Sequence, residues 1–355
     1  MKKIFLALIA ISCLFITGCF GNNSNDVLKD IKEKYNNLKA YELTGDLEIV
    51  NNDDVYNYDV KVIYQKKDKY YVSLKNRSNN HEQIILKNED GVYVLTPALN
   101  KSFKFQSDWP NNNSQVYLIQ SIIGDILNDE ERNLVSDDNN HMFTTSVNYP
   151  NNRKLVKQTV TFDKNLNLKK VSVLDENDIS QMTMTFLTID TNPDISSDTF
   201  DLNKIMNINE NNTDTNTNNN QQSNNTNTNQ NTNNETNNQP TSTLEDIIYP
   251  LYIPTGTVLA SEEKITKSDG ERVIMTFEGE KPFLLVEETS TIEEEFSIIP
   301  TYGEPYLLID TVGALTDSSI SWSSNGIDYY LVSDVMSQDE LLDIARSVNI
   351  IPTMK

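Results

Sequence analysis

Hydrophobic and polar residues alternate along much of the first half of the chain, with the period of two that is typical of half-buried β-strands. The alternation begins at Leu43, Gly45, Leu47 and Ile49 and returns in four further runs. Turn-forming residues such as Asp90-Gly91 separate these runs. The pattern therefore predicts an antiparallel meander with strands near residues 43–49, 56–64, 70–74, 84–86 and 92–95.

Two stretches have the 3.6-residue period of an amphipathic helix instead. The first covers residues 26–40, and the second begins at Ser114 and continues to Ile126. After the second helix, strand patterns resume near residues 143–149, 155–162, 168–173 and 182–189. We therefore expect an α+β domain over residues 26–206, built as one large curved antiparallel sheet with helices on its concave side.

The stretch 207–241 consists of Asn, Thr and Gln with almost no apolar side chain, so it cannot bury enough surface to offset its ordering entropy. It predicts a disordered linker to a second, smaller α+β domain over residues 242–355. In that domain, Asn325-Gly326 marks a hairpin turn. The final helix begins with the capping box Ser337 and Glu340.

The chain begins with Met1-Lys2-Lys3 and an apolar run to Ile16, which is the pattern of a secretory signal and is short for a membrane span. The run ends in Ile16-Thr17-Gly18-Cys19, which resembles the lipobox of bacterial lipoproteins; the alternative is an ordinary signal with a chance cysteine. The resemblance implies a signal peptide over residues 1–18, a lipid on Cys19 and a polar tether over 19–25. It places the protein at the outer face of the cytoplasmic membrane.

Charge and composition exclude several classes of function. The formal net charge is −23, so nucleic acid would be repelled, and the lipid must supply the membrane anchoring. The two histidines, His81 and His141, have no metal-ligand spacing, and neither of the two cysteines is available as a free thiol. Asp163-Lys164-Asn165 begins like a calcium loop but lacks the later Gly and Glu, which favours a plain turn. We expect a non-enzymatic protein with no cofactor and no metal.

Two consecutive motifs resemble the LolA-like lipoproteins of Gram-positive bacteria, a group that includes sporulation and germination lipoproteins. The motifs are Asp90-Gly91-Val92-Tyr93-Val94-Leu95-Thr96-Pro97 and Phe103-Lys104-Phe105-Gln106-Ser107-Asp108-Trp109-Pro110. The resemblance covers roughly residues 26–203. It implies an unclosed β-half-barrel with helices in its mouth and an apolar cavity between helices and sheet. The hairpin and last helix resemble the C-terminal domain of unknown function that accompanies some of these lipoproteins.

Five residues are candidates for lining the implied cavity: Phe103, Phe105, Trp109, Tyr117 and Leu118. Their alternative role is to fill an ordinary hydrophobic core, since the sequence alone does not show a void. The family's lipid carriers use an arginine to hold their cargo. No arginine precedes Arg77 in this chain, and Arg77 does not align with that role.

These observations lead to one main expectation and two alternatives about function. The first is a membrane-anchored lipoprotein that binds a lipid or acyl chain, with a role in sporulation or in the cell envelope. The second, implied by clostridial germination lipoproteins, is a protein-interaction subunit that supports a cell-wall amidase acting on the spore cortex. The third, based on domain order, is a regulator of a membrane signalling protein that resembles RseB.

Overall fold

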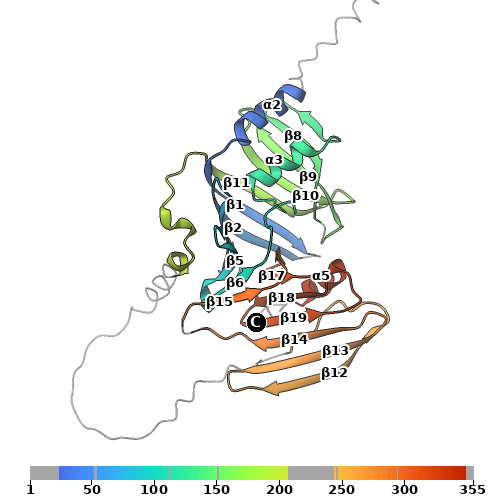
Figure 1. Cartoon of the computed structure of the whole chain (residues 1–355). Helices are drawn as coiled ribbons and strands as arrows, with labels where there is room; N and C mark the ends of the chain where they lie inside the picture. Colours follow the sequence, from blue (N-terminus) through green and yellow to red (C-terminus); the bar gives the residue numbers. More distant parts are fainter. Residues whose placement is uncertain are drawn as a thin grey trace, which may run out of the picture.

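A computed structural model describes residues 24–51, 54–111, 113–149, 152–206, 244, 247–293 and 295–348. The expected signal peptide, Cys19 and the whole of the expected linker lie outside the described residues. Within them the protein is mostly β-structure with few helices, arranged as a twelve-stranded and a seven-stranded sheet. Figure 1 shows the larger sheet above the smaller one.

The first sheet has the strand order β15-β6-β5-β4-β3-β2-β1-β11-β10-β9-β8-β7. Neighbouring strands are antiparallel with one exception, the parallel pair β15 and β6. Its strands are β1 (Ala40–Asn51), β2 (Asp54–Gln65), β3 (Lys69–Asn76), β4 (Glu82–Asn88), β5 (Gly91–Thr96), β6 (Lys101–Phe105), β7 (Asn133–Ser136), β8 (Asn140–Ser146), β9 (Leu155–Asp163), β10 (Leu168–Asp175), β11 (Ser180–Asp190) and β15 (Ser297–Thr301).

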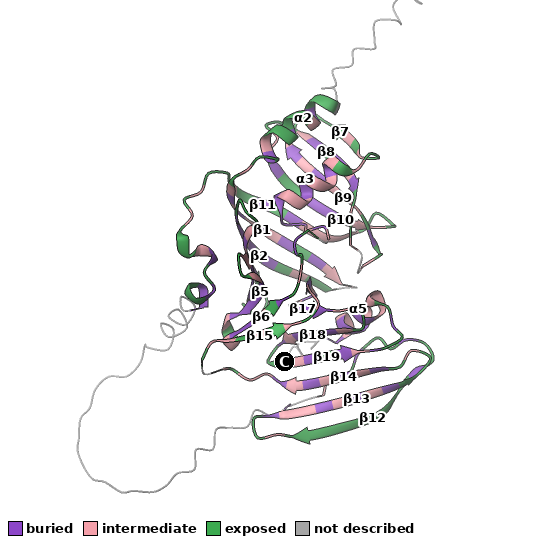
Figure 2. Ribbon diagram, viewed as in Figure 1, coloured by how far each residue is buried: buried purple, intermediate pink, exposed green. Residues whose placement is uncertain are grey.

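The predicted alternation corresponds to the two faces of this sheet. In β1, Tyr41, Leu43 and Leu47 are buried on the inner face, and β2 pairs with it so that Val62 lies opposite Leu43. Figure 2 shows buried and exposed positions alternating along these strands. Because successive side chains of a strand point to opposite faces, this pattern alone places the inner core.

Two helices cover the inner face (Figure 1): α2 (Ser24–Tyr35) and α3 (Ile119–Asn128). Both are shorter than the periodicity predicts. The first ends before residue 40 because Ala40 already belongs to β1. The second starts after Ser114 because Ser114 is hydrogen-bonded to Asn148. The Ser114 N–H donates to the Asn148 carbonyl at 2.8 Å, and the Ser114 Oγ accepts from the Asn148 N–H at 2.9 Å.

The outer face of the first sheet is covered by the chain that follows β11. The 3₁₀ helix η2 (Ser197–Phe200) and a helical turn at residues 202–206 pack Phe200, Leu202 and Met206 against apolar residues of β4 and β5. The sheet is therefore buried on both sides at β4 and β5. This second, smaller core explains why β4 and β5 read as nearly continuous apolar runs rather than alternating ones.

The second sheet has the order β12-β13-β14-β19-β18-β17-β16 and is covered on one face by α5 (Gln338–Ser347). Both halves of the predicted capping box are present at Ser337 and Glu340. The hairpin at Asn325-Gly326 is also confirmed, joining β18 to β19. The strands are β12 (Thr257–Thr266), β13 (Glu271–Gly279), β14 (Phe283–Thr289), β16 (Glu304–Leu307), β17 (Val312–Leu315), β18 (Ser319–Ser324) and β19 (Ile327–Val332).

The second sheet is docked against the first through buried polar contacts. Tyr58 donates its hydroxyl to the Ile309 carbonyl at 2.5 Å. The buried Gln83 accepts from the Thr311 hydroxyl at 3.1 Å and from the Val312 N–H. Val312 and Ala314 extend this junction by joining the core of the first sheet. The two sheets thus share one continuous hydrophobic cluster at their junction.

Candidate ligand pocket between the two sheets

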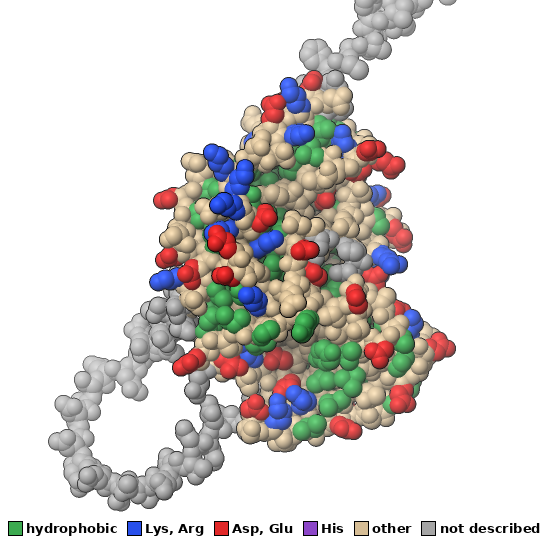
Figure 3. Space-filling view, viewed as in Figure 1, with side chains coloured by type: hydrophobic (Ala, Val, Ile, Leu, Met, Phe, Trp, Pro, Cys, Tyr) green, Lys and Arg blue, Asp and Glu red, His purple; other side chains and the backbone are tan. Residues whose placement is uncertain are grey.

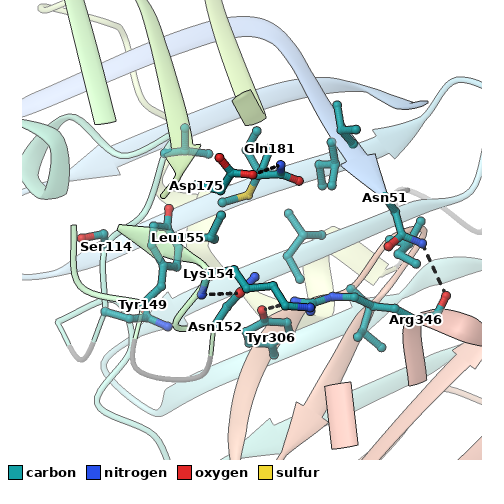
Figure 4. A pocket seen from close by; sticks show the side chains of 18 of the residues that line it. Asn51, Ser114, Tyr149, Asn152, Lys154, Leu155, Asp175, Gln181, Tyr306 and Arg346 are labelled. Carbon is teal, nitrogen blue, oxygen red and sulfur yellow. Dashed lines mark hydrogen bonds between the residues drawn. The ribbon is translucent and has the colours of Figure 1, made fainter. Parts of the chain in front are cut away.

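A hollow of about 600 Å³ lies where the open end of the first sheet meets the second sheet. The first sheet supplies one side of the pocket, from the ends of β1 and β9 and from the β10–β11 turn. The second sheet supplies the other, from β16, the loop that follows it and α5. We call this hollow the junction pocket (Figure 4).

Apolar side chains from both sheets line much of the junction pocket: Ile49, Ile85, Leu155, Met182, Leu307 and Ile309. Its volume and mixed lining fall within the range of small-molecule sites, which are mainly apolar with a few placed polar groups. A ligand with a hydrocarbon portion would find apolar contacts on both sides.

Charged groups converge on one wall, where α5 exposes Asp343 and Arg346. The two residues are three positions apart, so they share a helix face, and Arg346 Nη1 lies 3.7 Å from Asp343 Oδ1. The same carboxylate accepts from Lys154 Nζ at 3.1 Å. Arg346 Nη2 also donates to the Tyr306 hydroxyl at 2.7 Å. Lys154 and Arg346 thus meet at one carboxylate on this wall of the pocket.

The opposite wall is held by the β10–β11 turn. Asp175 Oδ1 accepts the N–H groups of Asn177 and Ile179, each at 2.9 Å, and Oδ2 accepts from Gln181 Nε2 at 2.9 Å. Figure 4 shows Asp175 and Gln181 across the pocket from Tyr306 and Arg346. Because these bonds are local, they fix the turn independently of the second sheet.

The structure separates the five residues predicted to line a cavity. Tyr117 lines the junction pocket, whereas Phe103 and Phe105 line a second hollow where the β15–β6 edge of the first sheet meets β17 to β19. Trp109 and Leu118 line neither pocket and are buried in the core of the first sheet. Arg77 lies on the surface, where its Nε donates to Asp59 at 2.8 Å.

The sequence did not indicate the wall that α5 and β16 contribute. The capping box predicts the helix, and Leu341, Ile344 and Ala345 predict its buried face, but the remaining residues read as an ordinary solvated side. Arg346 lies outside residues 26–203, the part of the chain in which the family resemblance implies a ligand cavity. The three-residue spacing of Asp343 and Arg346 does indicate that both side chains share one face of this helix, next to its buried face.

Asp125 of α3 stands behind this site, and burial raises the pKa of its carboxyl from 3.8 to about 6. Its Oδ2 accepts from Gln158 Nε2 at 3.0 Å. Between pH 4 and 6 the folded protein holds a proton here that the unfolded chain releases. The free energy of unfolding therefore falls as pH rises through this window.

We expect Asp125→Asn to remove that pH dependence, because the amide stays neutral while it can still accept from Gln158. Between pH 4.5 and pH 7.5, the free energy of unfolding of the natural protein should fall by on the order of 1 to 2 kcal/mol more than that of the variant. Urea unfolding at the two pH values measures this difference. Asp30→Asn on the exposed side of α2 is the control for loss of one carboxylate. Parallel stability profiles for Asp125→Asn and the natural protein would contradict the assignment.

No helix within the described ranges is long and apolar enough to cross a membrane. Across the same residues, no group of three or more His, Cys, Asp or Glu side chains could hold a metal ion. The junction pocket itself offers apolar walls, the cationic side chains of Lys154 and Arg346, and hydrogen-bonding groups such as the Tyr306 hydroxyl.

Comparison with known proteins identifies the family. Residues 1–200 match the family described as sporulation protein YdcC-like. The chain is also 32% identical over 351 residues to the sporulation protein YdcC of Bacillus subtilis strain 168, covering 98% of this chain and 97% of that protein. This chain belongs to the YdcC-like sporulation protein family. The expected relationship to sporulation proteins is confirmed, and the match extends through both sheets rather than the first alone.

Two solved complexes are also similar at low identity. The Pseudomonas aeruginosa MucA/MucB complex contains a chain with a TM-score of 0.31 and 9% identity, covering 91% of this chain and 98% of that one. The CwlD amidase–GerS lipoprotein complex of Clostridioides difficile contains one with a TM-score of 0.21 and 18% identity, covering 46% and 94% respectively.

Proposed function

We propose that this protein is a non-enzymatic lipoprotein, anchored through Cys19 at the outer face of the cytoplasmic membrane, that binds an amphipathic lipid in the junction pocket during sporulation. The observation that carries the proposal is the pocket itself: about 600 Å³, with apolar walls from both sheets and the cationic side chains of Lys154 and Arg346 on one side. A diacylglyceryl anchor at Cys19 would keep this pocket close to its source of ligand.

The orientation of the ligand follows from the arrangement of the walls. Its acyl portion would contact Leu155, Met182 and Leu307, where burial of apolar surface supplies the affinity. Its anionic head group would compete with Asp343 for Lys154 and Arg346. Guanidinium groups bind carboxylates and phosphates through paired hydrogen bonds, so Arg346 supplies the directional contact and Lys154 the point charge.

Native mass spectrometry with lipid extraction tests this proposal on residues 22–355, purified from the protein's own host. We expect an added mass that denaturation releases as an acyl lipid. A clean mass without lipid, together with a cell-wall hydrolase recovered by pull-down, would overturn the carrier function and leave an interaction subunit.

Filling the pocket makes the test specific to the site. Leu307→Trp adds an indole to the half-buried wall of the junction pocket, and we expect lipid occupancy to fall about tenfold or more because the larger side chain occupies ligand space. Leu187→Trp, at an exposed position of β11, is the matched control. Equal lipid occupancy in both variants would place the ligand elsewhere.

A second candidate function is a protein-interaction subunit, for a cell-wall amidase or for a membrane signalling protein. The observation that favours it is a run of exposed apolar side chains before β12: Tyr249, Leu251, Tyr252 and Ile253 are all more than a third exposed. Exposed apolar groups that are contiguous in this way are typical of interaction surfaces. Loss of the pulled-down hydrolase on Leu251→Ser, with lipid occupancy unchanged, would assign this function to that surface.

A further inference from the structure

Two kinds of contact hold the second sheet against the first. The first kind is buried: Tyr58 donates to the Ile309 carbonyl, and Gln83 accepts from the second sheet in the same way. The second kind is ionic, and it lies at the surface between α5 and the residues just before β9. Ile309 and Asp343 both line the junction pocket, so the pocket extends from one kind of contact to the other.

The ionic contacts join two consecutive cations of the first domain to two carboxylates on α5. Arg153 Nε lies 3.6 Å from Asp339 Oδ2. Lys154 Nζ donates to the two carboxylate oxygens of Asp343 at 3.1 and 3.2 Å. Asp339 and Asp343 are four positions apart, so they lie on the same face of α5. We call these two ion pairs the clasp.

The clasp is the weaker of the two kinds of contact. The side chains of Arg153 and Lys154 are 86% and 71% exposed, and their carboxylate partners are about one third exposed. Ion pairs in water contribute little to stability, and salt screens them. Breaking the buried contacts would instead leave donors without acceptors, which costs more. The two sheets therefore separate more easily at the clasp than at the buried contacts.

Separation at the clasp leaves few groups without a partner. Arg153 and Lys154 return to water, and Asp343 keeps Arg346, whose Nη1 lies 3.7 Å away on the same helix. One further hydrogen bond crosses between the sheets here, from Asn51 Nδ2 to the Arg346 carbonyl at 3.5 Å (Figure 4). It is at the long limit for a hydrogen bond, so it adds little resistance to opening.

We propose that the two sheets hinge about their buried contacts, and that the clasp controls the entry of ligand into the junction pocket. This inference rests on the proposed function, because the ligand that exchanges is the lipid proposed above. An anionic head group favours the open form, since it offers Lys154 a replacement for Asp343. A neutral lipid offers no such replacement. Loading is therefore coupled to release of the clasp.

The rate of lipid transfer tests the clasp directly. Fluorescent phosphatidylglycerol is loaded on residues 22–355 and transferred to neutral phosphatidylcholine vesicles. Transfer from the natural protein should be about fivefold faster in about 0.5 M NaCl than in about 0.02 M, because salt screens the clasp. Arg153→Gln should be about fivefold faster than the natural protein at the lower salt concentration, and it should respond less to added salt.

Lys61→Gln is the matched control for loss of an exposed ion pair. Lys61 lies 3.1 Å from Glu42, and both residues belong to the first sheet. The control is needed because charged side chains of both signs are spread over the surface (Figure 3). We expect Lys61→Gln to transfer lipid at the natural rate and with the natural salt dependence. Equal rates in Arg153→Gln and Lys61→Gln would overturn the proposal.

Covalent closure should have the opposite effect. Arg153→Cys with Asp339→Cys introduces the only two thiols of residues 22–355, because Cys13 and Cys19 precede this fragment. A short bis-maleimide across the two thiols should slow transfer at least about tenfold. The double variant without the linker should transfer lipid as fast as Arg153→Gln. Equal rates with and without the linker would contradict a clasp.

Spin labels separate failure of the clasp from failure of the proposed function. Glu176→Cys carries one label on the exposed β10–β11 turn, and Leu251→Cys carries the other on a segment that is bonded to Ser347 of α5. Without lipid, the distance between the labels should lengthen with added salt and in the Arg153→Gln background. Unchanged distances would overturn the clasp. Longer distances without any lipid transfer would uphold the clasp and overturn the lipid as its ligand.

Discussion

Trp109→Ala should lower the free energy of unfolding by about 3 to 5 kcal/mol, the cost typical of removing a large aromatic side chain from a core. Trp109 is 1% exposed and packs edge-on against Tyr70, with the ring centroids 5.6 Å apart. Its carbonyl also accepts from Lys87 Nζ at 2.8 Å, a contact that the substitution keeps. The loss is therefore one of packing and leaves the backbone anchor in place.

Urea unfolding followed by circular dichroism measures this loss, and lipid occupancy by native mass spectrometry separates the two roles that the sequence leaves open for Trp109. If Trp109 is a core residue, the substitution should lower the free energy of unfolding, while the molecules that remain folded keep their lipid. Trp109→Phe is the control, with a smaller loss because an aromatic ring still meets Tyr70. Retained stability combined with lost lipid would instead make Trp109 part of a ligand site.

Gln83→Ala should loosen the junction between the two sheets. The substitution removes the acceptor for the Thr311 hydroxyl and the Val312 N–H, and it leaves these two donors in a buried place without partners. An unsatisfied buried donor costs about 1 to 3 kcal/mol, so the docked arrangement should weaken by about 2 kcal/mol or more. The junction pocket lies between the same two sheets, so ligand binding should weaken along with it.

Amide hydrogen exchange gives the local measurement for this variant. Exchange at Val312 and its neighbours in β17 should accelerate at least about tenfold, while exchange in β1 and β2 should stay unchanged. Gln106→Ala, at an exposed position after β6, is the matched control. Unchanged exchange at Val312 would show that Tyr58 and the shared apolar cluster hold the junction without Gln83.

Much of the first sheet can be predicted from the sequence because its strands are amphipathic. Alternation at residues such as Leu43 and Leu47 locates β1, and the turns place its neighbours. β12 cannot be found in this way, because after Thr257 every residue of it is exposed and no alternation results. β15 has a pattern too short to assign, and its partner β6 is almost two hundred positions earlier in the chain.

The candidate site was predictable only in part, for a related reason. Tyr117 was identified because it belongs to an apolar helical stretch in the first domain, where a cavity was expected. The cationic wall depends on how α5 meets the residue before β9, and that contact joins Lys154 to Asp343 across 189 positions. Sequence periodicity reports which face of an element is buried, but it carries no information about which distant element covers the other face.

The parallel pairing of β15 with β6 has a consequence for the order in which the chain can be completed during synthesis. Once residues 1–206 have left the ribosome, eleven of the twelve strands of the first sheet have been synthesised. The backbone groups along the outer side of β6 then have no partner strand and face water. They find their partners only after residues 297–301 emerge. The first sheet is thus finished by a segment made near the end of translation, and a truncated product carries an open edge that a neighbouring chain could pair with.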